Sequence, residues 1–293
     1  SSDGTADALA RLSTPFALVV KSQENGGPAV ARNTGILAAS GEKVLFLDDD
    51  VVPDPVLVEE HLRVHDTESI DVVVLGTLSS LAHYAQPWVA WEQVQVEKQY
   101  VAMTRGDYAP SYRQFWTGNA SVSRAHLIEA GLFDVTYLRG EDVELGRRLA
   151  RRGLEFRFTP RARGLHHAER SLASWCHAHE SYGRLEVEIF QGDPTADPVA
   201  LLAGNWGRLR RPVRGFLRST FAVPGASSAL EMTLRRALEN ESVGRTRRVT
   251  GPLCSVLANL LYWRASRDAL GAVRFDQMLQ LADDFEKGRK KST

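Results

Sequence analysis

Cysteine is scarce in this chain of 293 residues, which has only Cys176 and Cys254. Because the two lie far apart and form no Cys-x-x-Cys spacing, the sequence indicates neither a disulfide framework nor a zinc site, and we expect a reducing compartment. Long hydrophobic runs are lacking as well. The longest nearly apolar piece, VLANLLYW at 256–263, is far shorter than the ~18 residues of a membrane span. We therefore expect no transmembrane span, and the start of the chain does not resemble a signal peptide.

An excess of one charge is also missing. The chain has 36 Lys and Arg against 36 Asp and Glu, which gives a formal net charge of +0. This balance argues against a protein built mainly to bind nucleic acid. With 43% hydrophobic and 25% charged residues, the composition excludes disorder, collagen-like repeats and a disulfide-rich miniprotein. The length predicts about two domains.

Strands and helices alternate through the first 80 residues. Apolar runs predict strands over 15–22, 43–50 and 71–79, and helical patterns cover 29–40 and 55–65. This alternation predicts an α/β fold, in which a mixed and mostly parallel sheet is flanked by helices.

The second part of the chain changes from α/β to helical patterns. Residues 80–115 mix aromatic and Gln/Glu residues without a clear period, so they give no assignment. From about 171 onward apolar residues recur only at helical spacing. We place a boundary in the Gly/Asp/Pro-rich stretch after 190, which predicts an α/β domain over 1–190 and a helical region over 191–293. Within the first domain, after the unassigned region, we predict a strand, tight turn and short strand over 115–124 and a helix over 141–153. A strand over 154–159 follows, which Pro160 ends.

Three polar clusters are candidates for chemistry. Asp48-Asp49-Asp50 follows an apolar strand, where ligands bind in open α/β sheets, and carboxylate oxygens suit Mg²⁺ or Mn²⁺. Glu141-Asp142 opens a helix, and His166-His167 follows the strand after it. Each cluster alone also has a plainer explanation. These are a solvated acidic turn, acids that favour the first turn of a helix, and a surface histidine pair.

Taken in order, however, these segments form a recognisable series. An acidic turn at Asp3 opens a helix, and GPAVARN (27–33), LDDD (47–50), TGNAS (117–121), GED (140–142) and HH (166–167) follow it. In this order they resemble family 2 glycosyltransferases of the GT-A fold, over roughly residues 1–185. Chains of that family begin with a strand, a helix and a second strand before the acidic turn. Since this chain begins at that turn, we expect the first strand and helix to be missing, as in a truncated reading frame.

The resemblance implies an inverting transfer from a nucleotide-diphosphate sugar, with UDP as the expected nucleotide, to a glycan or lipid-linked acceptor. It also implies Mg²⁺ or Mn²⁺, cell-envelope polysaccharide or glycolipid synthesis, and a cytoplasmic location at the inner face of the membrane. Asp142 would be the general base. The other implied roles are nucleotide-sugar binding by Asp3, Arg32, Asp48 and Asp49, metal binding by Asp48, Asp50 and either His166 or His167, and a sugar and acceptor pocket at Trp116, Gly118, Asn119 and Glu141.

Two other functions remain open on the sequence. A non-catalytic sugar-nucleotide or glycan-binding protein could share the fold, although it would need no base. A haloacid-dehalogenase-like phosphatase would use the strand and acids of LFLDDDVV (45–52), but it also needs a lysine for which only Lys98 is available. The arginine-rich stretch 208–218 allows either a peripheral membrane contact or the solvated face of a packed helix.

Overall fold

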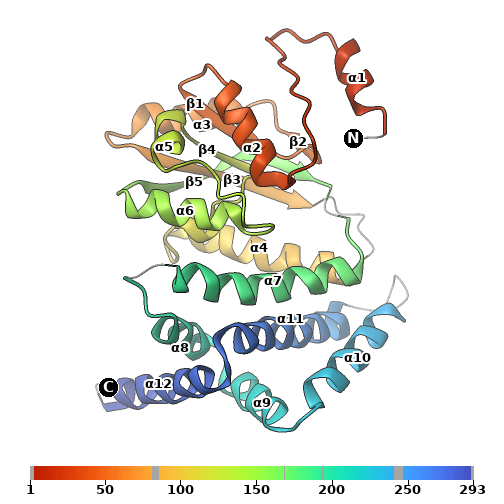
Figure 1. Ribbon diagram of the computed structural model, residues 1–293, viewed down its shortest axis with the longest axis vertical. Coiled ribbons are helices and arrows are strands. Elements are labelled where there is room, and N and C mark those ends of the chain that lie inside the picture. Colours follow the sequence, from red (N-terminus) through yellow and green to blue (C-terminus); the bar gives the residue numbers. More distant parts are fainter. Residues whose placement is uncertain (1–2, 81–85, 168, 193–194, 241–246, 292–293) are drawn as a thin grey trace. The chain divides into compact units, whose positions relative to one another are not determined.

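A computed structural model describes residues 3–80, 86–167, 169–192, 195–240 and 247–291 (Figure 1). The part before residue 170 contains five strands, one short 3-10 helix and six α-helices among its described residues. In chain order these are α1 (Thr5–Arg11), α2 (Gly27–Ala38), β1 (Lys43–Leu47), β2 (Val51–Pro53), α3 (Leu57–Thr67), β3 (Val72–Ser80), α4 (Pro87–Arg105), η1 (Tyr112–Gln114), β4 (Asn119–Ser123), α5 (Arg124–Glu129), α6 (Glu141–Arg151) and β5 (Glu155–His166). The rest is helical: α7 (Leu172–Gln191), α8 (Pro198–Arg208), α9 (Arg211–Ala222), α10 (Ala226–Glu239), α11 (Arg247–Leu270) and α12 (Ala272–Lys291).

The strands form one sheet in the order β1-β4-β3-β5-β2. β4 runs antiparallel to β1 and to β3, and β2 runs antiparallel to β5. β1 and β3 therefore point the same way, as strand–helix–strand alternation predicts. The sheet is nevertheless less parallel than expected, because β4, which comes later in the chain, lies between them in the opposite direction.

The strand predicted over 15–22 is wrong. This segment is neither helix nor strand in the structure, and the side chains of Phe16, Val19 and Val20 are exposed. Its apolar, β-branched residues suit a strand, but a strand needs a hydrogen-bonded neighbour. β1, the edge strand at that end of the sheet order, pairs only with β4 among the described residues.

Other boundaries also differ from the sequence-based prediction. β1 ends at Leu47, so the three aspartates lie outside it in a turn. β5 continues through Pro160 to His166, although we expected it to end at the proline. Pro160 is exposed and lies outside residues 164–166, which pair with β2, so its missing N–H does not interrupt that pairing. The first strand predicted within 115–124 is absent, and only β4 forms there. The unassigned region contains the 19-residue helix α4.

The chain divides into two compact units that do not follow a single boundary along the sequence. The first comprises residues 1–49, 54–77 and 109–163, and the second comprises 50–53, 78–108 and 164–293. The core of the first unit is built by apolar side chains of α2, the strands, α5 and α6, among them Ile36, Phe46, Phe115 and Leu145. α7 falls in the second unit, which differs from the boundary predicted after 190, because it packs against α11.

Close helix packing in the second unit depends on a glycine. A Cβ at Gly183 of α7 would lie 2.1 Å from the backbone oxygen of Tyr262 on α11, so any larger residue would separate the two helices. The arginines of α9 lie against α12. Arg211 and Arg214 pair with Glu286, and Arg218 pairs with Asp283, which favours the packed-helix alternative for this stretch. No helix in the described part of the chain is long and apolar enough to cross a membrane.

Candidate functional site

Arg32 joins two of the acidic motifs in the first unit. Its guanidinium on α2 donates to Glu141 Oε1 at 2.5 Å and to Asp48 Oδ1 at 3.1 Å, and it lies 5.8 Å from the centre of the Phe133 ring. Glu141 is buried, whereas Asp48 keeps 39% of its side chain exposed. One cation thus holds the turn after β1 against the start of α6, and its partner Glu141 lies 109 residues after Arg32 in the chain.

Asp142 follows Glu141 in the first turn of α6 and is half-buried. Removal from water and the neighbouring charge of Glu141 together raise the pKa of the Asp142 carboxyl from 3.8 to about 7, although Arg32 and the backbone N–H of Val143 oppose the rise. A carboxyl with this pKa exchanges its proton near neutral pH, as a general base must.

Asp50 and His166 lie together in the second unit. The β2–β5 register sets Val51 opposite His166, and His166 Nε2 lies 3.2 Å from Asp50 Oδ2. The backbone N–H of His167 donates to the Asp50 carbonyl at 2.8 Å, while the side chain of His167 is exposed. The structure therefore brings His166, and not His167, to the aspartate side chain.

The remaining predicted site residues lie in different surroundings. Asp3 is exposed, and its Oδ1 accepts hydrogen bonds from the hydroxyl and backbone N–H of Thr5, which lower the pKa of its carboxyl. Asp49 is exposed in the turn after β1. Trp116 is half-buried and Gly118 is buried in the turn that leads into β4.

Asn119 is interior, with 3% of its surface exposed. Its Nδ2 donates to the carbonyls of Thr77 and Ala162, each at 3.0 Å, and its Oδ1 lies 2.8 Å from Nε2 of His61. All polar groups of this side chain are thus engaged inside the first unit. Gly76 is required beside it, since a Cβ there would lie 2.3 Å from Asn119 Nδ2.

The hydrogen bonds also determine which nitrogen and oxygen atoms of this network carry a proton. Because Asn119 Nδ2 faces two carbonyls, its Oδ1 must accept from His61 Nε2–H, so the Nδ1 of a neutral His61 accepts from the hydroxyl of Ser121, 2.8 Å away. The Ser121 oxygen then accepts from His65 Nε2–H at 2.9 Å. Neutral rings are expected, since burial lowers the pKa of both histidines, that of His65 to about 4.

Truncation of Asn119 should therefore destabilise the protein. We expect Asn119→Ala to lower the free energy of unfolding by at least about 3 kcal/mol, because two buried carbonyls and His61 lose their partner. Urea unfolding followed by circular dichroism measures this. Asn240→Ala, at the exposed asparagine that ends α10, should change stability by less than about 0.5 kcal/mol. Unchanged stability of Asn119→Ala would contradict the structural role.

An ion pair that the sequence did not indicate lies in the second unit. Arg170 Nη2 contacts Glu92 Oε2 on α4 at 2.6 Å, and the indole N–H of Trp88 donates to the Arg170 carbonyl at 2.8 Å. Burial raises the pKa of the Glu92 carboxyl, against the opposing charges of Arg170 and His166. Glu92 lies in the region without a clear period, so the sequence gave no signal for it.

Within the described ranges, no group of three or more His, Cys, Asp or Glu side chains is arranged to hold a metal ion. The pair of Asp50 and His166 supplies two ligands of suitable chemistry. A divalent ion that binds a substrate phosphate usually keeps waters and phosphate oxygens in its other positions. The residues present therefore fit a metal that is bound together with a diphosphate.

Residues 1–127 match the family model described as glycosyl transferase family 2. The first 127 residues thus match a family 2 glycosyltransferase domain. A pre-mycofactocin glycosyltransferase of Mycobacterium tuberculosis is 31% identical over 186 residues, which are 61% of this chain and 38% of that protein. The uncharacterized glycosyltransferase YfnE of Bacillus subtilis is 27% identical over 205 residues, 54% of this chain and 52% of its own length. The chain thus spans only two fifths to about half of these relatives.

Among solved structures, the chain resembles the mannosyltransferase PcManGT of Pyrobaculum calidifontis in complex with GDP-Man and Mn²⁺. The TM-score is 0.50 at 18% identity, over 90% of this chain and 76% of that one. At this identity the likeness bears on the fold alone, and it confirms the GT-A prediction for the family 2 domain and its helical extension. These findings favour the glycosyltransferase interpretation over a haloacid-dehalogenase-like phosphatase.

Proposed function

We propose that this protein is a metal-dependent, inverting glycosyltransferase, which moves a sugar from a nucleotide-diphosphate sugar to an acceptor hydroxyl. The observation that carries the proposal is Asp142, a carboxyl with a pKa of about 7 at the start of α6, next to the ion-paired Arg32, Glu141 and Asp48. The family 2 match supports the same assignment.

Asp142 is the general base in this proposal. The oxygen of the acceptor hydroxyl forms a bond to the anomeric carbon, while the bond from that carbon to the diphosphate oxygen breaks and its electron pair leaves with the diphosphate. The hydroxyl proton passes to a carboxylate oxygen of Asp142. A base whose pKa lies near the working pH is more effective than an ordinary aspartate, and this role is worth typically ~10²–10⁴-fold in rate.

Asp50 and His166 hold the metal in this proposal, with Asp48 as the other acid of the DxD motif and His167 as the alternative to His166. A bound Mg²⁺ or Mn²⁺ supplies positive charge to the departing diphosphate and orients it. The pairing of Asp50 with His166 at 3.2 Å supports this assignment, because it brings an oxygen and a nitrogen ligand together on a partly exposed surface.

Arg32 positions the two acidic motifs relative to each other. By neutralising Glu141 and part of the charge on Asp48, it lets Asp142 ionise near neutral pH in spite of its burial. Asp3 and Asp49 are assigned to the nucleotide sugar, and Trp116, Gly118 and Glu141 to the walls of the sugar and acceptor pocket. For Asn119, the buried hydrogen bonds support a role in shaping that pocket from behind.

The donor in this proposal is a nucleotide sugar. The sequence predicts UDP as its nucleotide, and the GDP-Man complex of the structurally similar mannosyltransferase makes GDP a second candidate. A glycan or lipid-linked acceptor of the cell envelope remains our proposal for the other substrate. A reducing, cytoplasmic location likewise remains our proposal, and it rests on the sequence, in which Cys176 and Cys254 are the only cysteines.

Calorimetry tests the proposal directly. The protein is titrated with UDP and with GDP, each with Mn²⁺, with Mg²⁺ and with EDTA. We expect at least one nucleotide to bind in the presence of metal and not in EDTA. We also expect slow hydrolysis of the corresponding sugar donor, which releases that nucleotide. Absence of metal-dependent binding for both nucleotides would contradict the proposal. Binding without transfer or hydrolysis for any donor would instead indicate the non-catalytic alternative.

A further inference from the structure

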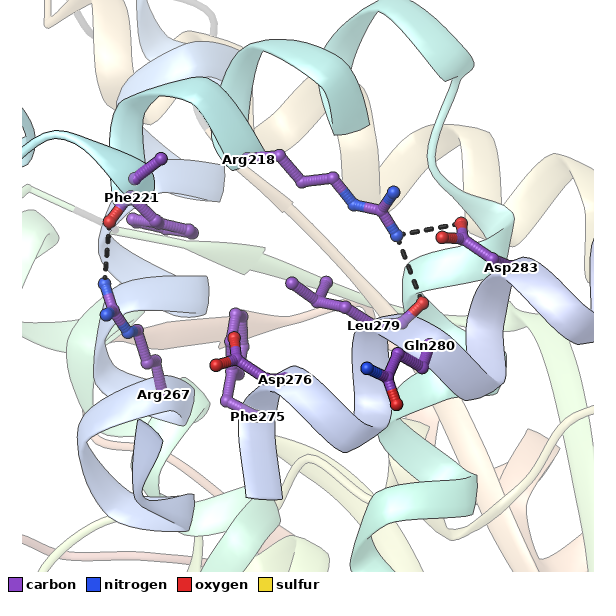
Figure 2. A pocket seen from close by; sticks show the side chains of 9 residues that line it. Arg218, Phe221, Arg267, Phe275, Asp276, Leu279, Gln280 and Asp283 are labelled. Carbon is purple, nitrogen blue, oxygen red and sulfur yellow. Dashed lines mark hydrogen bonds and ion pairs between the residues drawn. The ribbon is translucent and has the colours of Figure 1, made fainter. Parts of the chain in front are cut away.

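The C-terminal helices of the second unit line an open cavity of about 590 Å³ (Figure 2). This volume lies within the ~300–1,000 Å³ typical of ligand sites. Side chains of α9, α11 and α12 line it: Arg218, Phe221, Ala222, Arg267, Phe275, Asp276, Leu279, Gln280 and Asp283. None of them takes part in the proposed transfer reaction.

The charges around this cavity balance. Two arginines face two aspartates, and Arg218 already contacts Asp283 at 2.8 Å and the Leu279 carbonyl at 3.1 Å. Arg267 donates to the Phe221 carbonyl at 3.1 Å and lies 5.9 Å from the centre of the Phe221 ring. A balanced site of this kind gives little attraction to a phosphate or a nucleotide, so it favours a neutral polar ligand.

The cavity combines flat hydrogen-bonding groups with an aromatic ring. Asp276 and Gln280 are both exposed and lie four residues apart on α12, Asp276 towards Arg267 and Gln280 next to Leu279 (Figure 2). Carboxylate, amide and guanidinium groups can each bond two neighbouring hydroxyls at once. Phe221 is half-buried and Leu279 lies beside it, which provides apolar surface for the C–H face of a sugar ring.

Two smaller cavities lie further along α12. One of about 190 Å³ shares Arg218 and Asp283 with the first cavity and reaches Arg214 and Glu286. A third cavity of about 180 Å³ shares Arg214 and Glu286 with the second one and ends at the exposed Phe285. The ion pairs Arg218–Asp283 and Arg214–Glu286 stand where neighbouring cavities meet, so the first and largest of the three is the candidate ligand site.

We propose that the cavity lined by α9, α11 and α12 is a saccharide-binding site, in which an oligosaccharide donates hydrogen bonds to Asp276, accepts them from Arg267, exchanges them with Gln280 and contacts Phe221. The site goes beyond the proposed transfer function, because it lies on other elements of the chain and its occupation requires neither donor nor metal. Balanced charge and paired planar polar groups favour a neutral glycan over an anionic ligand.

Saturation-transfer NMR with the whole protein tests the proposal, in EDTA and without nucleotide. The probes are the methyl glycosides of mannose, glucose, galactose and N-acetylglucosamine, together with mannobiose, cellobiose and chitobiose. We expect at least one disaccharide to give a saturable signal and to bind more tightly than its monosaccharide. In Asp276→Ala/Gln280→Ala, which changes two exposed side chains, its affinity should fall about tenfold.

Gln277→Ala and Asp284→Ala are the matched controls, because both residues are exposed on α12 and neither lines a cavity. Their affinity should equal that of the wild type. The proposal is overturned if no probe gives a saturable signal, if the double variant binds as the wild type does, or if inorganic phosphate displaces the saccharide. Since no donor or metal is present, these results are independent of whether the protein transfers a sugar.

Discussion

Replacement of Asp142 by asparagine should reduce sugar transfer by about 10²–10⁴-fold, because the acceptor hydroxyl loses the group that takes its proton. Asparagine has nearly the same shape but cannot accept that proton, so binding of the nucleotide and metal should be unchanged. Initial rates with a transferable donor measure the first effect, and calorimetry measures the second. Asp66→Asn, at an exposed aspartate of α3, should retain the wild-type rate. Undiminished transfer by Asp142→Asn would exclude Asp142 as the base.

Asp142→Asn should also raise the stability of the protein at alkaline pH, although it lowers the transfer rate. Between pH 3.8 and about 7 the folded protein keeps a proton on Asp142 that the unfolded chain has released, so this group lowers stability as the pH rises through that interval. Asp142→Asn should therefore have a higher melting temperature than the wild type at pH 8, and the gain should vanish below pH 4. The transfer rate of the wild type should in turn rise with pH through about 7. A melting difference independent of pH would contradict the raised pKa.

Removal of a metal ligand should have the second large effect. We expect Asp50→Ala to weaken metal-dependent nucleotide binding on the order of 100-fold or more, since even residues that only support metal ligands are worth about 10–100-fold. His166→Ala should behave in the same way, because its imidazole lies 3.2 Å from the carboxylate of Asp50. Calorimetry at several Mn²⁺ concentrations gives both affinities.

His167→Ala is the matched control for this experiment. It removes the neighbouring imidazole, which is exposed, but keeps the backbone N–H that bonds to the Asp50 carbonyl. Affinity should therefore remain close to that of the wild type. If His167→Ala loses binding while His166→Ala does not, the metal assignment belongs to the other histidine.

Local patterns in the sequence determined much of the fold. The strand over 71–79 and the helix over 141–153 correspond to β3 and α6, because their periodicity reflects burial on one face or on both. The prediction of a strand over 15–22 was wrong for a non-local reason, since its apolar residues have no described strand beside them. The long helix α4 was missed because its mixed residues show no clear apolar stripe.

The sequence by itself also determined where the acidic and histidine motifs lie, since the order of LDDD, GED and HH along the chain can be read directly. Only the tertiary structure decided which of these residues meet. Arg32 bonds to Glu141 across 109 residues, and the position of β4 between β1 and β3 depends on pairings that no local pattern encodes. The β2–β5 register places His166 opposite Val51 and beside the Asp50 side chain, whereas His167 lies one residue beyond the end of β5.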